Sequence, residues 1–373
     1  MTLELRVPFV DLARVTSAQR DVLADALQGV VDSGWFVLGE QGRSFEAEFA
    51  RACGVHDAVG VGSGTDAIEI TLRALDIGEG DEVLTQANTC VPTVAAIERA
   101  GAIPVLCDVD AESAVMDPES LDAAIGPATR AVVVVHLYGQ CADMASIAAV
   151  CERRGVALVE DCAQAHGARL DDRHAGSFGV AGCFSFYPTK NLAALGDGGA
   201  VVTDDLELAE RIRRLRQYGQ IDRYEHVERG VNSRLDELQA AVLRTRLPSL
   251  EQANDRRREI ADQYAEALGG TSARPLLRLG ARVHAFHLFV TRVPDREAFQ
   301  SDLLRDGIQT LVHYPRPVHG QPPYRELGEN ARVSLRNAET LAREIVSLPL
   351  YPELTDAEID HVAACARAAA RRT

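Results

Sequence analysis

Residues 182–200 have the sequence GCFSFYPTKNLAALGDGGA and include Lys190, the one lysine of the chain. A guanidinium stays protonated, whereas a lysine amine loses its proton in a suitable pocket and attacks a carbonyl carbon. Biased codon usage would also leave a single lysine by chance. The surroundings favour a chemical role, because an apolar, aromatic run ends at Pro188 and the glycine-rich turn 196–199 follows. The pattern predicts a strand end that opens into a loop carrying Lys190.

A second glycine turn lies in residues 58–75, AVGVGSGTDAIEITLRAL, where a short strand pattern leads into a helix pattern. Free N–H groups and the dipole at a helix start attract anions, and glycine lets the ligand approach the backbone. Ser63, Gly64 and Thr65 are therefore candidate phosphate ligands. The turn lacks the ending of a P-loop and is no dinucleotide fingerprint. A glycine turn before a helix is also common as plain structure.

Strand and helix patterns alternate between these two turns. Apolar runs predict strands at 82–85, 103–109, 131–137 and 156–160, and helical spacing predicts helices at 91–100, 118–125 and 144–153. This order predicts an α/β fold with a mostly parallel sheet and helices on both faces. Ligands bind at the carboxyl ends of such strands. The polar residues expected to converge there are Asn88, Thr89, His136, Asp161, Gln164 and Lys190.

Asp161 follows the apolar run 156–159 and is expected at the end of a core strand. An aspartate at this position also serves as an ordinary cap of the next segment. As a functional group, its carboxylate would pair with a cationic ring nitrogen. Pyridoxal phosphate requires a lysine for its aldehyde, such a carboxylate for its ring and donors for its phosphate. Lys190, Asp161 and the turn at Gly64 meet these three requirements.

The second half of the chain suggests a change of domain. Helical periodicity continues from 231 to 268 with a single proline, Pro248, and predicts a long helix that bridges two domains. A strand is expected at 287–293, and helices are expected at 17–33, 41–53, 204–217, 296–305, 338–346 and 355–370. We therefore predict a large domain over 1–250 and a smaller C-terminal α/β domain over 251–373.

Composition excludes several classes of protein. The net charge of −16 disfavours binding to nucleic acid or to anionic membranes. The chain has no apolar run of about 18 residues, and its first residues lack the features of a signal peptide, so we expect a cytoplasmic protein without membrane attachment. Eight scattered cysteines without a C-x-x-C pair predict neither a disulfide framework nor a metal site.

Seven segments together resemble the nucleotide-sugar aminotransferases of the DegT family, pyridoxal phosphate enzymes of the aspartate-aminotransferase fold, fold type I. They are GSGTDAIEITLRALDIGEGDEV (62–83), VHLYGQCADM (135–144), VEDCAQAHGA (159–168), FSFYPTKNLAALGDGGAVVT (184–203), NSRLDELQAAVL (232–243), HYPRPVH (313–319) and SLPLYPELT (347–355). They occur in order over nearly the whole chain, and the combination is more specific than any single segment.

The resemblance implies roles for individual residues. Lys190 would form the Schiff base with the cofactor and move the substrate proton. Asp161 would pair with the pyridine nitrogen, and Gln164 would lie near the 3-oxygen. The phosphate would be held by Gly64, Thr65 and Ser185.

Three further residues carry over from the same family. Asn232 would reach the phosphate from the neighbouring subunit, which implies a homodimer with shared active sites. His313 and Tyr314 match a loop near the bound sugar. The chain departs from the family at Cys90, where many members have an aromatic ring that stacks on the cofactor.

The resemblance also implies the reaction. The amino group of L-glutamate, which becomes 2-oxoglutarate, would pass to a nucleotide-linked keto sugar, with a dTDP-3-keto-6-deoxyhexose ranked first and 4-keto sugars and cyclitols behind. A sugar dehydratase is an alternative, but relatives that dehydrate sugars have histidine at the position of Lys190. A pyridoxal phosphate-binding regulator without turnover is an alternative from another class.

Overall fold

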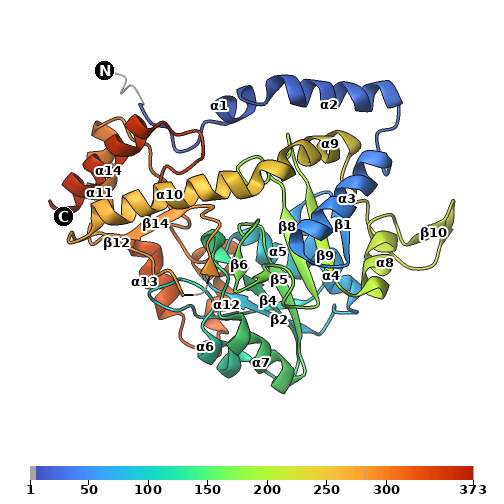
Figure 1. The fold of residues 1–373 in the computed structure, drawn as a ribbon. Coiled ribbons are helices and arrows are strands. Elements are labelled where there is room, and N and C mark those ends of the chain that lie inside the picture. Colours follow the sequence, from blue (N-terminus) through green and yellow to red (C-terminus); the bar gives the residue numbers. More distant parts are fainter. Residues whose placement is uncertain (1–5, 281, 373) are drawn as a thin grey trace.

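The computed structural model describes residues 6–280 and 282–372 and contains a seven-stranded central sheet (Figure 1). The strand order is β1-β9-β8-β5-β4-β2-β3, and the strands from β8 to β3 are parallel. Only β9 runs against its neighbours in this sheet. The predicted mostly parallel sheet is confirmed. Its strands are β1 (Asp57–Val61), β2 (Glu82–Gln86), β3 (Ile103–Cys107), β4 (Thr129–Val135), β5 (Ala157–Asp161), β8 (Ala181–Ser185) and β9 (Gly199–Thr203).

Helices cover both faces of this sheet, as its apolar runs predict. On β4, Ala131 and Val133 pack on one side, and Val132 and Val134 pack on the other. The first side is covered by α4 (Gly64–Ala74), α5 (Val91–Arg99) and α8 (Leu206–Leu215). The second side is covered by α3 (Glu40–Cys53), α6 (Pro118–Ala124), α7 (Met144–Arg154) and α9 (Glu237–Arg246).

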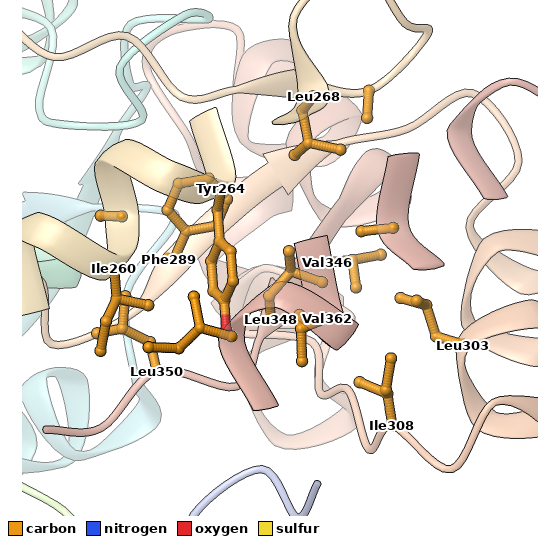
Figure 2. Packing of buried hydrophobic residues seen from close by; sticks show 14 of the residues in the cluster. Ile260, Tyr264, Leu268, Phe289, Leu303, Ile308, Val346, Leu348, Leu350 and Val362 are labelled. Carbon is orange, nitrogen blue, oxygen red and sulfur yellow. The ribbon is translucent and has the colours of Figure 1, made fainter. Parts of the chain in front are cut away.

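The C-terminal part has a separate apolar cluster, in which Tyr264, Phe289, Leu348 and Val362 pack together (Figure 2). It forms between the antiparallel sheet β12-β14-β15 and three helices. Burial of one such side chain stabilises the fold by about 2 kcal/mol. The elements are α10 (Leu250–Leu268), β12 (Arg274–Pro275), β14 (Phe289–Arg292), α11 (Arg296–Arg305), β15 (Ile345–Leu348) and α14 (Asp356–Ala370). Helix α13 (Arg336–Glu344) packs in a different apolar cluster, through Ala338 and Leu341.

The prediction of one continuous helix over 231–268 is wrong. Helix α9 begins only at Glu237, and the 3-10 turn η2 (Leu247–Ser249) separates it from α10, which runs on toward the C-terminal part (Figure 1). Pro248 lies inside this turn, where its missing N–H and its ring oppose regular helical hydrogen bonding. The helix predicted over 338–346 also ends early. Ile345 and Val346 pair instead with β14, so tertiary pairing overrides the helical periodicity.

Smaller elements connect these layers. At the N-terminal end, α1 (Leu12–Ser17) precedes α2 (Arg20–Ser33), and the hairpin of β10 (Gln220–Asp222) and β11 (Glu225–His226) projects beside α8 (Figure 1). The others are η1 (Leu137–Gly139), β6 (Arg169–Leu170), β7 (Arg173–His174), β13 (Arg282–Val283), η3 (Val318–Gly320), η4 (Pro322–Tyr324) and α12 (Arg325–Glu329). Across the described ranges, the helices lack the combined length and apolar character needed to cross a bilayer.

Candidate active site

A cavity of about 400 Å³ lies at the carboxyl ends of β2, β4, β5 and β8, where the sequence predicts a ligand site. It brings together residues that are far apart in the chain. Eight predicted residues line it, namely Ser63, Gly64, Thr65, Thr89, Asp161, Gln164, Ser185 and Lys190. Cys90 and Thr93 also line this cavity.

Lys190 lies on the turn that follows β8, as predicted. Its main-chain N–H donates to the Tyr187 carbonyl at 2.8 Å. The next residue, Asn191, fixes the turn, because its side-chain amide donates to Asn254 Oδ1 and to the Ala285 carbonyl, both at 2.8 Å. Burial lowers the pKa of Lys190, and the nearby charge of Asp161 opposes this shift. The amine therefore loses its proton more readily than a lysine in water.

Asp161 ends β5 and is 5% exposed. Its Oδ1 accepts from the Ala163 N–H at 3.0 Å, and its Oδ2 accepts from the Thr93 hydroxyl at 2.9 Å. Burial raises the pKa of Asp161, while these two hydrogen bonds and the charge of Lys190 act in the opposite direction. A cation that enters the cavity would stabilise the ionised carboxylate further.

The N-terminus of α4 forms one wall of the cavity. Ser63 caps the helix by accepting from the Asp66 N–H at 3.1 Å, so its oxygen is engaged within the helix. The N–H groups of Gly64 and Thr65 precede the point at which intrahelical bonding begins. A Cβ on Gly64 would lie 2.6 Å from the Ser185 Cβ, so glycine permits the helix and the end of β8 to meet here. This arrangement suits an anion held by amides and hydroxyls.

Gln164 is oriented by a main-chain donor. The Tyr138 N–H donates to Gln164 Oε1 at 2.6 Å, and Gln164 Nε2 donates to the Tyr314 hydroxyl at 3.2 Å. A backbone N–H only donates, so it requires the amide oxygen on its side and leaves Nε2 on the other. The Tyr314 hydroxyl is also hydrogen-bonded with the Cys90 thiol, whose pKa is raised by burial.

Two predicted members of the converging set lie elsewhere. His136 and Asn88 are fully buried and do not line the cavity, so that part of the prediction is wrong. His136 Nε2 lies 2.8 Å from Glu160 Oε2, on the side of β5 opposite to Asp161. The Glu160 carboxylate also accepts from the N–H groups of Gly176, Phe178 and Gly179. These hydrogen bonds explain why His136 and Glu160 are buried together.

The remaining predicted residues take three different positions. Tyr314 contacts Gln164 at the edge of the cavity, and the His313 ring lies 2.8 Å from the Ser347 hydroxyl through Nδ1. Burial lowers the pKa of His313 to about 4. Asn232 is exposed, forms a backbone bridge with Gln217 and is not among the residues that line the cavity.

Sequence reasoning missed two residues with direct contacts to the predicted set. Thr93, in the first turn of α5, holds Asp161. Tyr138 holds Gln164 through its N–H. The position of Thr93 after a core strand was a usable signal, because α5 begins at the same sheet edge as the other site residues. Tyr138 gave no such signal, because its contact is made by the main chain.

Comparison with known proteins gives a family match over most of the chain. The model of the DegT/DnrJ/EryC1/StrS aminotransferase family matches residues 18–367. The chain is 46% identical over 365 residues to the erythromycin biosynthesis sensory transduction protein EryC1 of Saccharopolyspora erythraea, covering 98% of this chain and 100% of that one. It is 46% identical over 356 residues to the dTDP-3-amino-3,4,6-trideoxy-alpha-D-glucose transaminase of Streptomyces venezuelae, covering 94% and 92%.

A solved structure is similar over its full length. The crystal structure of S. venezuelae DesV in complex with a ketimine intermediate superposes with a TM-score of 0.95 at 43% identity. The match covers 99% of this chain and 100% of that chain. The fold is therefore that of the sugar aminotransferases of fold type I.

Proposed function

Because the chain belongs to the DegT/DnrJ/EryC1/StrS aminotransferase family, we propose that it transfers an amino group from L-glutamate to a dTDP-3-keto-6-deoxyhexose. The broader activity is that of a pyridoxal phosphate-dependent aminotransferase of nucleotide sugars. The observation that carries the proposal is Lys190 in one cavity with Asp161 and the amides of α4. The sugar and its ring carbon are inferred from what the similar transaminase is named for.

The cavity fits pyridoxal phosphate on the chemistry of its side chains. Gly64, Thr65 and Ser185 would hold the phosphate, Asp161 the ring nitrogen, Gln164 the 3-oxygen and Lys190 the aldehyde carbon. Gly64 lies so close to Ser185 that a side chain at residue 64 would collide with Ser185, so the phosphate site requires glycine here. When bound, the cofactor supplies an aldehyde that accepts amino groups and a ring that withdraws electrons.

The residues of the chain supply proton control. Lys190 Nζ, whose pKa is lowered by burial, takes the substrate proton as a base and returns it as an acid. The Asp161 carboxylate would keep a proton on the ring nitrogen, and Thr93 and the Ala163 N–H hold that carboxylate in place. Nε2 of Gln164 would donate toward the 3-oxygen, because the Tyr138 N–H fixes the orientation of the amide.

Thr93→Val is expected to move the acid limb of the pH–rate profile upward by about one pH unit. The pKa of Asp161 is already raised by burial, and the variant removes a hydroxyl that stabilises the ionised form. The carboxylate then becomes protonated, and activity falls, at a higher pH than in the wild type. Thr203→Val is the control, since its buried hydroxyl donates to the Val180 carbonyl at 2.7 Å outside the cavity. An acid limb that does not move in Thr93→Val would contradict the role of this hydrogen bond.

The proposal includes a homodimer with shared active sites. Among the described residues that line the cavity, Lys190 is the single cationic side chain, although the ligands carry several phosphate charges. Asn232 is exposed and does not line the cavity of its own chain, as expected of a residue that serves the second subunit. Trp35 and Tyr224 are 62% and 80% exposed, and apolar surface of this kind is typical of contacts between chains.

Mixing Lys190→Arg and Asn232→Ala subunits is expected to restore about a quarter of wild-type activity. Random pairing makes half of the dimers mixed, and each mixed dimer has one intact site. Each variant alone is expected to have little activity. Mass spectrometry of subunits with different tags checks that mixed dimers form. Mixed dimers without recovered activity would contradict the sharing of sites.

Two proposals concern the whole chain. We place the enzyme in the cytoplasm, since its eight cysteines are free thiols and six of them are buried, which suits a reducing compartment. We also divide the chain into domains at residue 250, because residues 260–370 supply nearly all of the C-terminal apolar cluster.

A mass-spectrometric screen tests the proposed reaction. The holoenzyme is incubated with 3-keto and 4-keto sugars linked to dTDP or UDP, each with and without L-glutamate. The proposal expects conversion of a keto group to an amine, dependent on glutamate, with the dTDP-3-keto sugar as the best substrate. Loss of water without a need for glutamate would favour a dehydratase. Unchanged sugar masses across the panel would exclude the proposed function and favour a regulator.

A further inference from the structure

Tyr138 stands out because an unfavourable backbone conformation coincides with contacts to two predicted site segments. Its φ of 61° lies in the left-handed region, which residues with a Cβ rarely adopt. The residue is buried, at 3% exposure, beside the cavity-lining residue Leu137. A non-glycine residue in this conformation is retained only where its surroundings fix it. The contacts of Tyr138 therefore indicate what its conformation serves.

Tyr138 makes hydrogen bonds to both predicted site segments. Its N–H donates to Gln164 Oε1 at 2.6 Å, and its hydroxyl donates to the main-chain oxygen of His313 at 2.5 Å. Gln164 Nε2 donates in turn to the Tyr314 hydroxyl at 3.2 Å. These contacts close a ring of four residues, Tyr138, Gln164, Tyr314 and His313. The ring ties the segment 313–314 to the residue expected at the cofactor.

The turn at Tyr138 and Gly139 is fixed by contacts with neighbouring segments. Gly139 follows with a φ of 101°, and a Cβ there would lie 3.0 Å from the Gln164 carbonyl and from the N–H groups of Phe286 and His287. The Ala285 N–H donates to the Gly139 carbonyl at 2.9 Å. The turn is thus held from both sides. Burial raises the pKa of Tyr138, so its hydroxyl keeps the proton that it donates to His313.

We propose that Tyr138 is a positioning residue that acts through two separate groups. Its main-chain N–H orients Gln164, and its hydroxyl holds the segment 313–314 next to Gln164. The inference rests on the function proposed above, in which Gln164 contacts the cofactor, and on the family resemblance, which implies that this segment lies near the sugar. The two roles can be tested separately, because a substitution can remove the hydroxyl while the main-chain N–H stays.

Tyr138→Phe is expected to release the segment 313–314 and leave Gln164 in place. Hydrogen–deuterium exchange, followed by mass spectrometry without any sugar, should be faster in a peptide spanning 309–316 and unchanged in one spanning 163–167. The KM for the keto sugar should rise about tenfold, the effect of one lost hydrogen bond. The rate of amine transfer from glutamate and the absorbance spectrum of the holoenzyme should stay at wild-type values.

Tyr264→Phe is the matched control. The Tyr264 hydroxyl is also buried and donates to a main-chain carbonyl, that of Pro349, at 3.0 Å, but it lies in the C-terminal apolar cluster. Both variants lose a buried hydroxyl that donates to a main-chain carbonyl, so their midpoints of thermal unfolding should fall by similar amounts. Only Tyr138→Phe should change exchange in 309–316 and the KM for the sugar.

The outcomes separate this inference from the proposed function. If the wild type forms no amino sugar while Tyr138→Phe still exchanges faster in 309–316, the proposed function fails and the positioning of the segment stands. If Tyr138→Phe matches the wild type in exchange over 309–316, the inference is overturned whether or not the enzyme is active. An equal rise in KM in Tyr264→Phe would also overturn it, because the effect would then be general loss of stability.

Discussion

Lys190→Arg is expected to lower amino transfer by about 10⁴-fold, the upper range for the loss of a general acid–base group. The arginine keeps a positive charge at this position but forms no covalent bond to an aldehyde and releases no proton. In the wild type, burial lowers the pKa of Lys190 and favours the neutral, nucleophilic amine. The measurement is single-turnover transfer from glutamate, followed by the absorbance of the cofactor.

The variant is expected to keep its fold and to bind the cofactor without a covalent link, because the amides of α4 and Ser185 are unchanged. Arg43→Lys is the matched control. It makes the reverse exchange at a side chain that is 65% exposed and paired with Glu40. Its activity should equal that of the wild type. Lys190→Arg with more than about 1% of wild-type turnover would contradict the assignment of the proton transfer to Lys190.

Asp161→Asn is expected to lower turnover by about 10² to 10³-fold, as for the loss of one preorganised electrostatic partner. The amide still accepts from the Ala163 N–H, so the geometry of the β5 end should persist. It carries no negative charge and cannot keep a proton on a ring nitrogen. The electron-withdrawing effect of the ring is then weakened, although Lys190 is unchanged.

Asp161→Asn distinguishes covalent attachment of the cofactor to Lys190 from catalytic turnover. Asp161→Asn should still be labelled on Lys190 after borohydride reduction with the cofactor, whereas Lys190→Arg should not. Asp205→Asn is the control, since Asp205 only caps α8 and asparagine caps a helix equally well. Wild-type turnover in Asp161→Asn would show that the carboxylate has no role in the reaction.

The strand and helix order was predictable because the buried strands are apolar without interruption. The run Ala131–Val134 alternates between two apolar clusters, so both faces needed apolar residues. Helical periodicity placed Pro248 inside one long helix and did not predict that the helix is interrupted there. The strand at Ile345 was missed, because its pairing with β14 depends on residues more than 50 positions away.

The candidate site was predictable where a side chain follows a strand in a parallel sheet. Lys190, Asp161 and Gln164 lie in the cavity for this reason, since such strand ends meet at one edge. His136 also follows a strand, but its ring turns to Glu160, and sequence position does not determine the face. The role of Tyr138 could not be predicted from its position after a strand. Its role depends on a main-chain N–H in a left-handed turn, which the residue type does not indicate.

The division at residue 250 and the roles of the site residues stay predictions.

The reaction depends most on the attachment of the cofactor to one amine, and this attachment can be measured cleanly because Lys190 is the single lysine of the chain. The wild-type protein is incubated with pyridoxal phosphate, reduced with borohydride, digested and analysed by mass spectrometry. The account predicts one pyridoxyl group, on the peptide that contains Lys190. An unlabelled Lys190 peptide at saturating cofactor would contradict it.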